Sequence, residues 1–283
     1  MKAHTQYDGD HDDHDDYGGL QRDLRATGAA MDRRGLLRLA ARFGVGAGAL
    51  QLIGCGASPT SPTETSTGTT GTTGSTCSAR IPEETQGPYP GDGSNGPSVL
   101  GLTGVVRSDI RSSFAGLSGS ADGAPLTLAL TIVSASTCAP LSGRAVYVWH
   151  CDRPGRYSLY SSGVTNQNYL RGVQEADGSG RVTFTTIFPG CYAGRWPHIH
   201  FEIYPSPSAA TNAANKVATS QLALPKAACD EVYATSGYEA SVTNLSRVSL
   251  ATDNVFSDGS SLELATVTGS VSGGLTATLT VAI

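Results

Sequence analysis

The sequence has 283 residues and a formal net charge of −5 at pH 7. Only 15% of the residues are charged and 39% are hydrophobic, which excludes both a coiled coil and a wholly disordered chain. Basic residues are not in excess, so the composition gives no support to nucleic-acid binding, which depends on a positively charged surface. The chain after residue 76 is long enough to bury one sizeable core.

Residues 1–30 form an acidic, histidine-containing segment that predicts a disordered extension. They contain seven aspartates and three basic residues, and too few apolar side chains to offset the entropy lost on ordering. A metal-binding tail is the alternative, since aspartate and histidine are both metal ligands. Met31 is a second candidate for the translation start besides Met1.

Residues 31–55 have the pattern of an export signal. Arg33 and Arg34 begin a segment that resembles the twin-arginine signal, and an apolar stretch follows from 43 to 53. That stretch is too short to span a bilayer permanently but suits the apolar core of a signal peptide. Its end, Leu52-Ile53-Gly54-Cys55, resembles a lipoprotein processing site. We therefore expect an exported protein, periplasmic or at the cell surface, held to the envelope membrane by lipid on Cys55. An N-terminal anchor helix, or a cleaved signal with an unmodified cysteine, is the alternative.

Residues 56–79 predict a flexible tether, followed by one folded domain over residues 80–283. Eighteen of the twenty residues from 57 to 76 are Ser, Thr, Gly or Pro. A chain of this composition cannot bury enough apolar surface to order itself.

An odd number of cysteines follows Cys55. An exported protein can form disulfides, but five thiols cannot all pair within one chain. At the level of sequence the pairing stays open, as does the oligomeric state. The five are Cys77, Cys138, Cys151, Cys191 and Cys229.

The folded part alternates apolar and polar residues with a period of two. The stretches 126–132 and 275–283 alternate in this way, as half-buried strands do. Residues 145–149 are apolar on both faces, as in a central strand, and a further strand is predicted over 181–188. Many short strands joined by Gly-rich loops predict an all-β fold, a β-sandwich of two sheets with few short helices.

His198 and His200 are the most informative pair of residues. Side chains two apart on a strand point to the same face, so both imidazoles could bind one ion, with Ile199 facing the core. Two histidines on a solvated face are the alternative. His150, the third histidine of the folded part, lies after a run that is buried on both faces and is better explained as a core or supporting histidine. Without another histidine the pattern of a zinc hydrolase or a cupin is incomplete, although Glu202 lies on the same face.

Several short segments together resemble the intradiol ring-cleavage dioxygenases, the family of protocatechuate 3,4-dioxygenase and catechol 1,2-dioxygenase. The similarity is dense from about 83 to 204 and weaker beyond. The segments are Thr85-Gln86-Gly87-Pro88-Tyr89, Val148-Trp149-His150-Cys151-Asp152, Gly155-Arg156-Tyr157, Tyr169-Leu170-Arg171-Gly172-Val173-Gln174, Thr186-Ile187-Phe188-Pro189-Gly190-Cys191-Tyr192 and Arg195-Trp196-Pro197-His198-Ile199-His200.

This resemblance implies a metal site and roles for six residues. Tyr157 and Tyr192 match the two tyrosinate ligands of the family, and His198 and His200 match its two histidine ligands. Arg195 matches an active-site arginine that stabilises negative charge on the substrate ring. Gln221 matches an active-site glutamine more loosely.

The implied activity is that of a non-haem Fe(III) dioxygenase acting on a catechol-type small molecule and O₂. Cleavage between the two hydroxyl-bearing carbons would give a cis,cis-muconate, and Tyr192 is the ligand expected to leave the metal when substrate binds. The alternative from another class is a non-catalytic, transthyretin-like β-sandwich binding module tethered to the cell envelope.

Overall fold

The computed structural model describes residues 79–283. The predictions for the acidic extension, the export signal, the lipid on Cys55 and nearly all of the tether fall outside these residues. Within them, no helix combines the length and the apolar character needed to cross a membrane.

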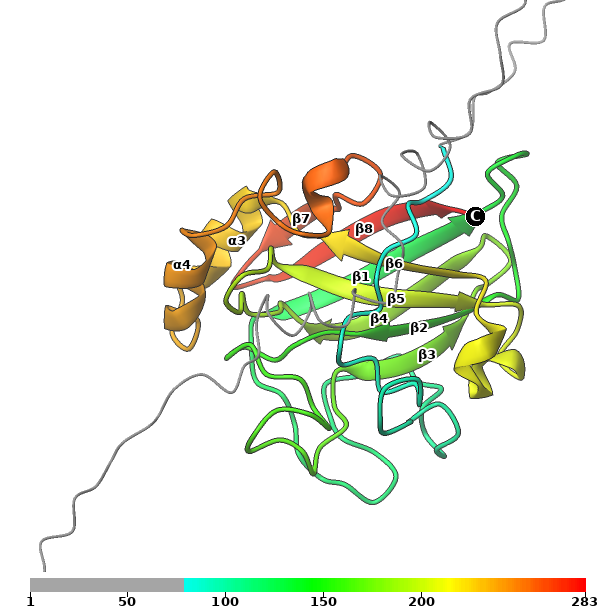
Figure 1. The fold of residues 1–283 in the computed structure, drawn as a ribbon, viewed down its shortest axis with the longest axis horizontal. Coiled ribbons are helices and arrows are strands. Elements are labelled where there is room, and N and C mark those ends of the chain that lie inside the picture. Colours follow the sequence, from blue (N-terminus) through cyan, green and yellow to red (C-terminus); the bar gives the residue numbers. More distant parts are fainter. Residues whose placement is uncertain (1–78) are drawn as a thin grey trace, which may run out of the picture. The chain divides into compact units, whose positions relative to one another are not determined.

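Two four-stranded sheets make up the described part of the chain (Figure 1). In both sheets neighbouring strands run antiparallel, except that β1 and β8 are parallel. The first sheet has the order β4 (Arg181–Ile187), β1 (Pro125–Val133), β8 (Gly274–Ala282) and β7 (Thr266–Ser270). The second has the order β3 (Arg171–Glu175), β2 (Ala145–Trp149), β5 (His198–Tyr204) and β6 (Ala218–Ala223).

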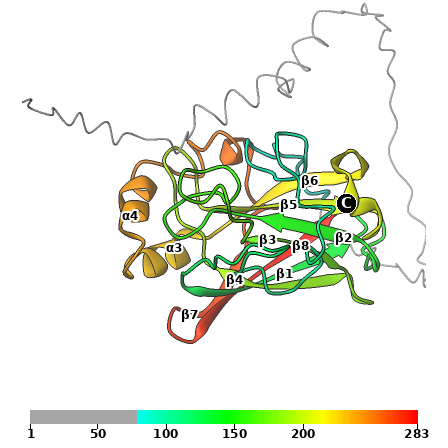
Figure 2. The same cartoon turned by 90° about the horizontal axis from the view of Figure 1, so that it is seen from below.

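The sheets lie one over the other and enclose the main apolar core (Figure 2). The alternation of β1 places Leu128 and Leu130 in this core, and β5 contributes Ile199 and Phe201 from the facing sheet. All four of these side chains are completely buried. The predicted β-sandwich is therefore confirmed, because period-two sequences on both sheets bury their apolar faces against each other.

Helices are few and short in residues 79–283, as the sequence predicts. Helices α3 (Lys226–Tyr233) and α4 (Glu239–Leu245) lie together at one end of the sandwich (Figure 1). Three single turns of 3₁₀-helix complete the set: η1 (Ala209–Thr211), η2 (Ala213–Asn215) and η3 (Phe256–Asp258).

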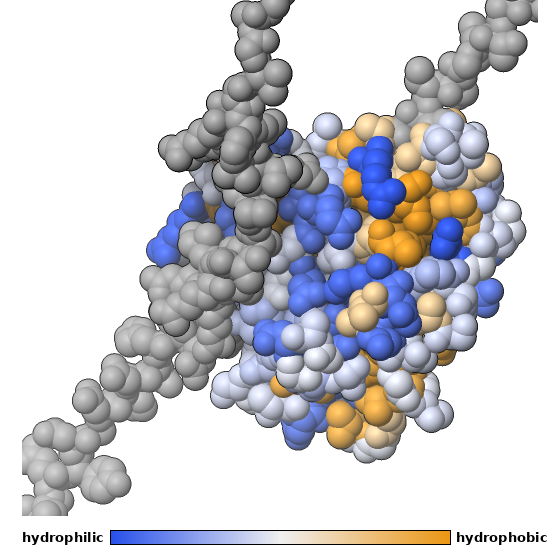
Figure 3. Space-filling model, turned by 45° about the vertical axis from the view of Figure 1, so that its right-hand side comes forward, coloured by the Kyte–Doolittle hydropathy of each residue, from blue (hydrophilic) through white to orange (hydrophobic). Residues whose placement is uncertain are grey.

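A second apolar cluster lies on the outer face of the sheet that contains β5. Tyr147 and Trp149 of β2 point to this side, where loops supply Tyr89, Tyr157 and Tyr192. Burial on both faces explains why β2 and β5 have no exposed residue. Loop residues therefore cover this outer face of the sheet. On the molecular surface, one view shows a hydrophobic patch next to hydrophilic areas (Figure 3).

The described cysteines divide into one bonded and three free residues. Cys138 is disulfide-bonded, whereas Cys151, Cys191 and Cys229 are buried free thiols. Burial raises the pKa of Cys191 to about 12, so this thiol stays protonated at neutral pH.

Candidate metal centre

Strand β5 presents the two histidines to the outer, loop-covered face of its sheet. His200 lies opposite Trp149 of β2 on one side and Gln221 of β6 on the other. The Trp149 indole stacks on the His200 ring, with centroids 4.8 Å apart and an interplanar angle of 6°. Both His198 and His200 are only 2% exposed. The prediction that the two imidazoles share a face, with Ile199 in the core, is confirmed.

Tyr157 comes from the loop after β2. The Asp152 carboxylate organises this loop, because it accepts hydrogen bonds from the Arg156 backbone N–H at 2.8 Å and from the Tyr169 hydroxyl at 3.0 Å. The Tyr157 backbone N–H donates a hydrogen bond to Ser161 Oγ at 2.9 Å, which fixes the backbone at Tyr157. The Tyr157 side chain is consequently 2% exposed and points toward the two histidines.

Tyr192 comes from the loop between β4 and β5, which packs tightly against the loop of Tyr157. Gly155 has a φ of +93°, and a Cβ placed there would lie 3.1 Å from Tyr192 Cβ. A Cβ at Gly190 would lie 2.4 Å from the carbonyl oxygen of Arg153. Glycine at these two positions allows the two tyrosine-bearing loops to approach each other.

Three donor atoms lie close to one another on the outer face, and a fourth lies next to one of them. Tyr157 Oη is 3.3 Å from His198 Nε2 and 3.2 Å from His200 Nε2, and these two nitrogens are 3.0 Å apart. Tyr192 Oη lies 3.3 Å from His198 Nε2. The structure therefore brings together all four residues that the resemblance implies as ligands, from one strand and two separate loops.

Both histidines are held neutral, and His198 has a lone pair available at the shared point. His198 Nδ1 lies 2.5 Å from the Trp196 carbonyl oxygen, so Nδ1 carries the proton and Nε2 is left as an acceptor. Burial lowers the pKa of His198 to about 3, and the nearby Arg195 guanidinium lowers it as well. Burial also lowers the pKa of His200 well below its usual value. Neutral imidazole is the form that binds metal ions.

The donor set fits a metal ion, and specifically a hard one. Three atoms with separations of 3.0 to 3.3 Å can all lie about 2 Å from one point, which is the usual metal–nitrogen and metal–oxygen distance. No group of three or more His, Cys, Asp and Glu side chains within residues 79–283 could hold a metal. The site thus depends on its phenol oxygens, and a highly charged ion favours their ionised form.

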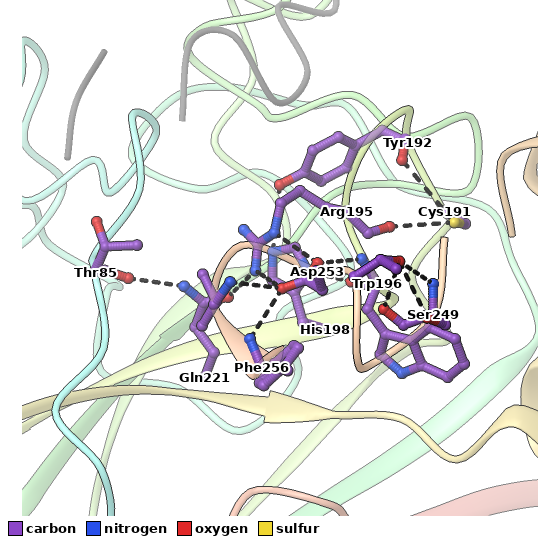
Figure 4. Close-up of polar contacts among 12 residues, drawn as sticks. Thr85, Cys191, Tyr192, Arg195, Trp196, His198, Gln221, Ser249, Asp253 and Phe256 are labelled. Atoms are coloured by element: carbon purple, nitrogen blue, oxygen red, sulfur yellow. Dashed lines mark hydrogen bonds and ion pairs between the residues drawn. The ribbon is translucent and has the colours of Figure 1, made fainter. Parts of the chain in front are cut away.

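Arg195 and Gln221 are joined to each other next to this centre (Figure 4). Arg195 Nη2 donates to Gln221 Oε1 at 2.6 Å, and Gln221 Nε2 donates to the Thr85 carbonyl oxygen at 2.8 Å. Both polar groups of the Gln221 amide are therefore used within the protein, so Gln221 orients Arg195. The Thr85 segment, which the sequence singles out, is thereby tied to the site.

Asp253 is the main residue of the site that sequence reasoning missed. Its carboxylate accepts a hydrogen bond from Arg195 Nε at 3.0 Å and another from the Trp196 backbone N–H at 2.7 Å (Figure 4). Asp253 lies 58 residues from Arg195 in the sequence. No local pattern links such positions, so only the fold reveals the pair.

His150 and Glu202 make hydrogen bonds away from the candidate metal centre. His150 bonds through Nδ1 to the Cys151 carbonyl oxygen at 2.8 Å and through Nε2 to Thr186 Oγ1 at 2.7 Å, as a core histidine. The Glu202 carboxylate accepts bonds from Lys216 Nζ at 2.8 Å and from the Tyr204 hydroxyl at 2.6 Å. Glu202 thus has both oxygens committed away from the histidines, which argues against the cupin alternative.

Comparison with known proteins finds dioxygenases similar to this chain. A family model described as "Dioxygenase" matches residues 108–211. An intradiol ring-cleavage dioxygenase from Tetranychus urticae is 26% identical over 72% of this chain and 94% of its own, with a TM-score of 0.58. A 3-chlorocatechol 1,2-dioxygenase from Rhodococcus opacus 1CP is 17% identical over 72% of each chain, with a TM-score of 0.45. No curated protein matches the chain.

The family model and the Tetranychus urticae structure confirm the resemblance to intradiol ring-cleavage dioxygenases and the fold that it implies. The range matched by the family model contains Tyr157, Tyr192, Arg195, His198 and His200. Gln221 and Asp253 lie beyond it.

Proposed function

We propose that the chain is a non-haem Fe(III) dioxygenase that opens a catechol-type ring between the two hydroxyl-bearing carbons, with both atoms of O₂ entering a cis,cis-muconate product. The observation that carries this proposal is the convergence of Tyr157 Oη, His198 Nε2 and His200 Nε2 within 3.0 to 3.3 Å of one another, with Tyr192 Oη 3.3 Å from His198 Nε2. A binding module has no need for four buried donors directed at one point.

Tyr157, Tyr192, His198 and His200 are the residues that would hold the iron. When bound, ferric iron would withdraw electron density from the catechol and make a ring carbon reactive toward O₂. The protein keeps both imidazoles neutral by burial, and the Trp196 carbonyl oxygen orients the His198 ring so that Nε2 faces the centre. The stacked Trp149 indole sets the plane of the other imidazole.

Proton transfer and charge stabilisation are assigned to Tyr192 and Arg195. The Tyr192 phenolate oxygen is the proposed acceptor for the proton of one of the two catechol hydroxyls. The Arg195 guanidinium is held by Asp253 and Gln221 and supplies positive charge beside the ring. A fixed charge that need not reorganise during the reaction is an effective way to lower a barrier.

The experiment is a combined oxygen and product assay on protein reconstituted with ferric iron. Uptake of one O₂ per catechol consumed, with ¹⁸O from ¹⁸O₂ in both new carboxylates, is the expected result. Protein that binds catechol without consuming O₂ would instead support the transthyretin-like binding module.

A matched pair of variants connects the assay to the site. His200→Ala removes one converging donor and should abolish both iron retention and turnover. Tyr160→Phe removes a hydroxyl that bonds to the Asn95 carbonyl oxygen and the Gly91 N–H outside the cluster, so this variant should keep its iron and its rate.

A further inference from the structure

The Asp253 carboxylate connects residues 195–196 to the turn 253–256 beside the candidate metal centre. Asp253 Oδ2 accepts from Arg195 Nε at 3.0 Å and from the Trp196 N–H at 2.7 Å. Asp253 Oδ1 accepts from the backbone N–H groups of Val255 and Phe256 at 2.9 and 3.1 Å. The side chains of Asp253 and Arg195 are both 0% exposed.

The charges of Asp253 and Arg195 compensate each other in a buried position where neither charged side chain would be stable alone. Moving an isolated guanidinium or carboxylate out of water costs several kcal/mol. Asp253 offsets that cost for Arg195, and the backbone N–H groups satisfy the remaining acceptor positions of its carboxylate. The result is an arginine that is fully buried beside the centre and fixed in direction, since its Nε and Nη2 are both bonded.

The same carboxylate also reaches a metal-binding residue through the backbone. The Trp196 N–H is bonded to Asp253, and the carbonyl oxygen of the same residue accepts the Nδ1 proton of His198. Both peptide groups that flank the Trp196 Cα are thus fixed by polar contacts. A shift in the 253–256 turn would move Arg195 and the support of His198 together.

We propose that Asp253 is a positioning residue for the reaction: it holds the Arg195 guanidinium in place and steadies His198 through Trp196. The effect of Asp253 on the reaction rests on the proposed function, because it requires that the site cleaves catechol. The proposal goes beyond that function by assigning a role to the 253–256 turn, which lies outside the range that the family model matches.

The central test replaces Asp253 by asparagine. Asp253→Asn keeps the size and one acceptor oxygen for the backbone N–H groups but removes the charge that pairs with Arg195. We expect kcat to fall by about 10- to 100-fold with a smaller change in KM, the range typical when a residue that supports a metal site or its ligands is lost. The visible band of the ferric protein should also shift, because the His198 ring loses its fixed orientation.

Asp258→Asn is the matched control. Asp258 is an exposed aspartate of the same turn region, so the same substitution there should change neither kcat nor the spectrum. The variant pair Asp253→Asn and Arg195→Lys should be strongly non-additive, because Asp253 acts through Arg195. Additive losses, or equal losses in Asp253→Asn and Asp258→Asn, would overturn the proposal.

A second measurement does not depend on turnover or on any variant that fails to fold. In the metal-free wild-type protein, the Nε–H proton of Arg195 should exchange slowly with solvent, as observed by NMR, because it is buried and bonded to a carboxylate. Exchange at the rate of an exposed arginine would overturn the proposal. If this proton is protected but the wild type consumes no catechol, the proposed function fails while the positioning of Arg195 stands.

Discussion

The indole ring of Trp149 lies almost parallel to the imidazole of His200, at 6° and with centroids 4.8 Å apart. The two residues face each other in register on β2 and β5. Indole Nε1 is buried and has no hydrogen-bond partner within residues 79–283, so ring contact rather than a polar bond sets its position. A ligand whose plane is fixed by stacking loses less entropy when it binds a metal.

This stacking predicts a graded effect of substitution at Trp149. Trp149→Phe keeps an aromatic face, and we expect little change in iron binding. Trp149→Leu keeps apolar volume but removes the flat surface, so we expect iron to bind about 10-fold more weakly. Competition against a ferric chelator measures this affinity, and equal affinity in the leucine variant and the wild type would contradict the role of Trp149.

The four proposed ligands should differ in how much damage their loss causes. Tyr157→Phe should remove most of the red colour expected from tyrosinate coordination of ferric iron, since we propose that Tyr157 stays bound throughout the reaction. Tyr192→Phe should keep part of its iron and still bind catechol, because Tyr192 is the ligand that we propose leaves the metal when substrate binds. Iron per chain and the visible spectrum measure both effects. Identical losses in the two variants would refute the distinct role of Tyr192.

Gly155 should be required for the approach of the two tyrosine-bearing loops. Gly155→Ala places a Cβ 3.1 Å from Tyr192 Cβ at a φ of +93°, which we expect to cost about 1–3 kcal/mol of stability and to weaken iron binding. Gly178→Ala is the control, because no atom lies within 4 Å of a Cβ there. Thermal unfolding of both variants decides the point, and a Gly155→Ala protein as stable as Gly178→Ala would contradict it.

Burial of His150 predicts a loss of stability in mild acid. Burial lowers the pKa of His150 to about 4, whereas an unfolded histidine titrates near its usual value of about 6.5. The unfolded chain therefore binds this proton first, and stability that is complete above pH ~6.5 declines as the pH falls toward 4. The full decline for one such group is on the order of 3 kcal/mol.

Chemical denaturation of metal-free protein at several pH values between 7 and 4 measures this decline. His150→Gln removes one titrating group, and its stability should change less steeply with pH than that of the wild type. Parallel curves for the two proteins would show that His150 is not held neutral by the fold.

Membrane attachment is a separate proposal that concerns residues outside the described part. We propose that Cys55 carries lipid, and that Cys55→Ser therefore releases or misprocesses the protein while leaving dioxygenase activity intact. Membrane fractionation, with mass spectrometry of the mature N-terminus, provides the measurement. Equal membrane association of Cys55→Ser and the wild type would assign the anchoring to the apolar stretch 43–53 instead.

The sequence predicted five strands, because their residues follow a clear burial rule; one of them, around His198 and His200, is β5. The alternation over 126–132 and 275–283 and the doubly apolar run 145–149 correspond to β1, β8 and β2, and the predicted strand over 181–188 is β4. Strands β3, β6 and β7 were not predicted. Arg171–Glu175 and Thr266–Ser270 contain glycine and few apolar residues, so pairing with neighbours rather than local pattern makes them strands.

The candidate ligands could be predicted from the sequence because their spacing and order resemble those of a family. The structure adds the contacts between residues that lie far apart in the sequence. Asp253 reaches Arg195 across 58 residues, and Thr85 reaches Gln221 across 136 residues. Contacts between residues so far apart in the sequence arise from the packing of loops over the outer face of the sheet. A single sequence carries no local signal for them.

The most direct test of the central claim is the position of iron in crystals of the ferric protein, located by anomalous scattering at the iron edge. We expect one strong peak about 2 Å from Tyr157 Oη, His198 Nε2 and His200 Nε2, the usual distance for such donors. A peak elsewhere, or none at this point in protein that still cleaves catechol, would contradict the account.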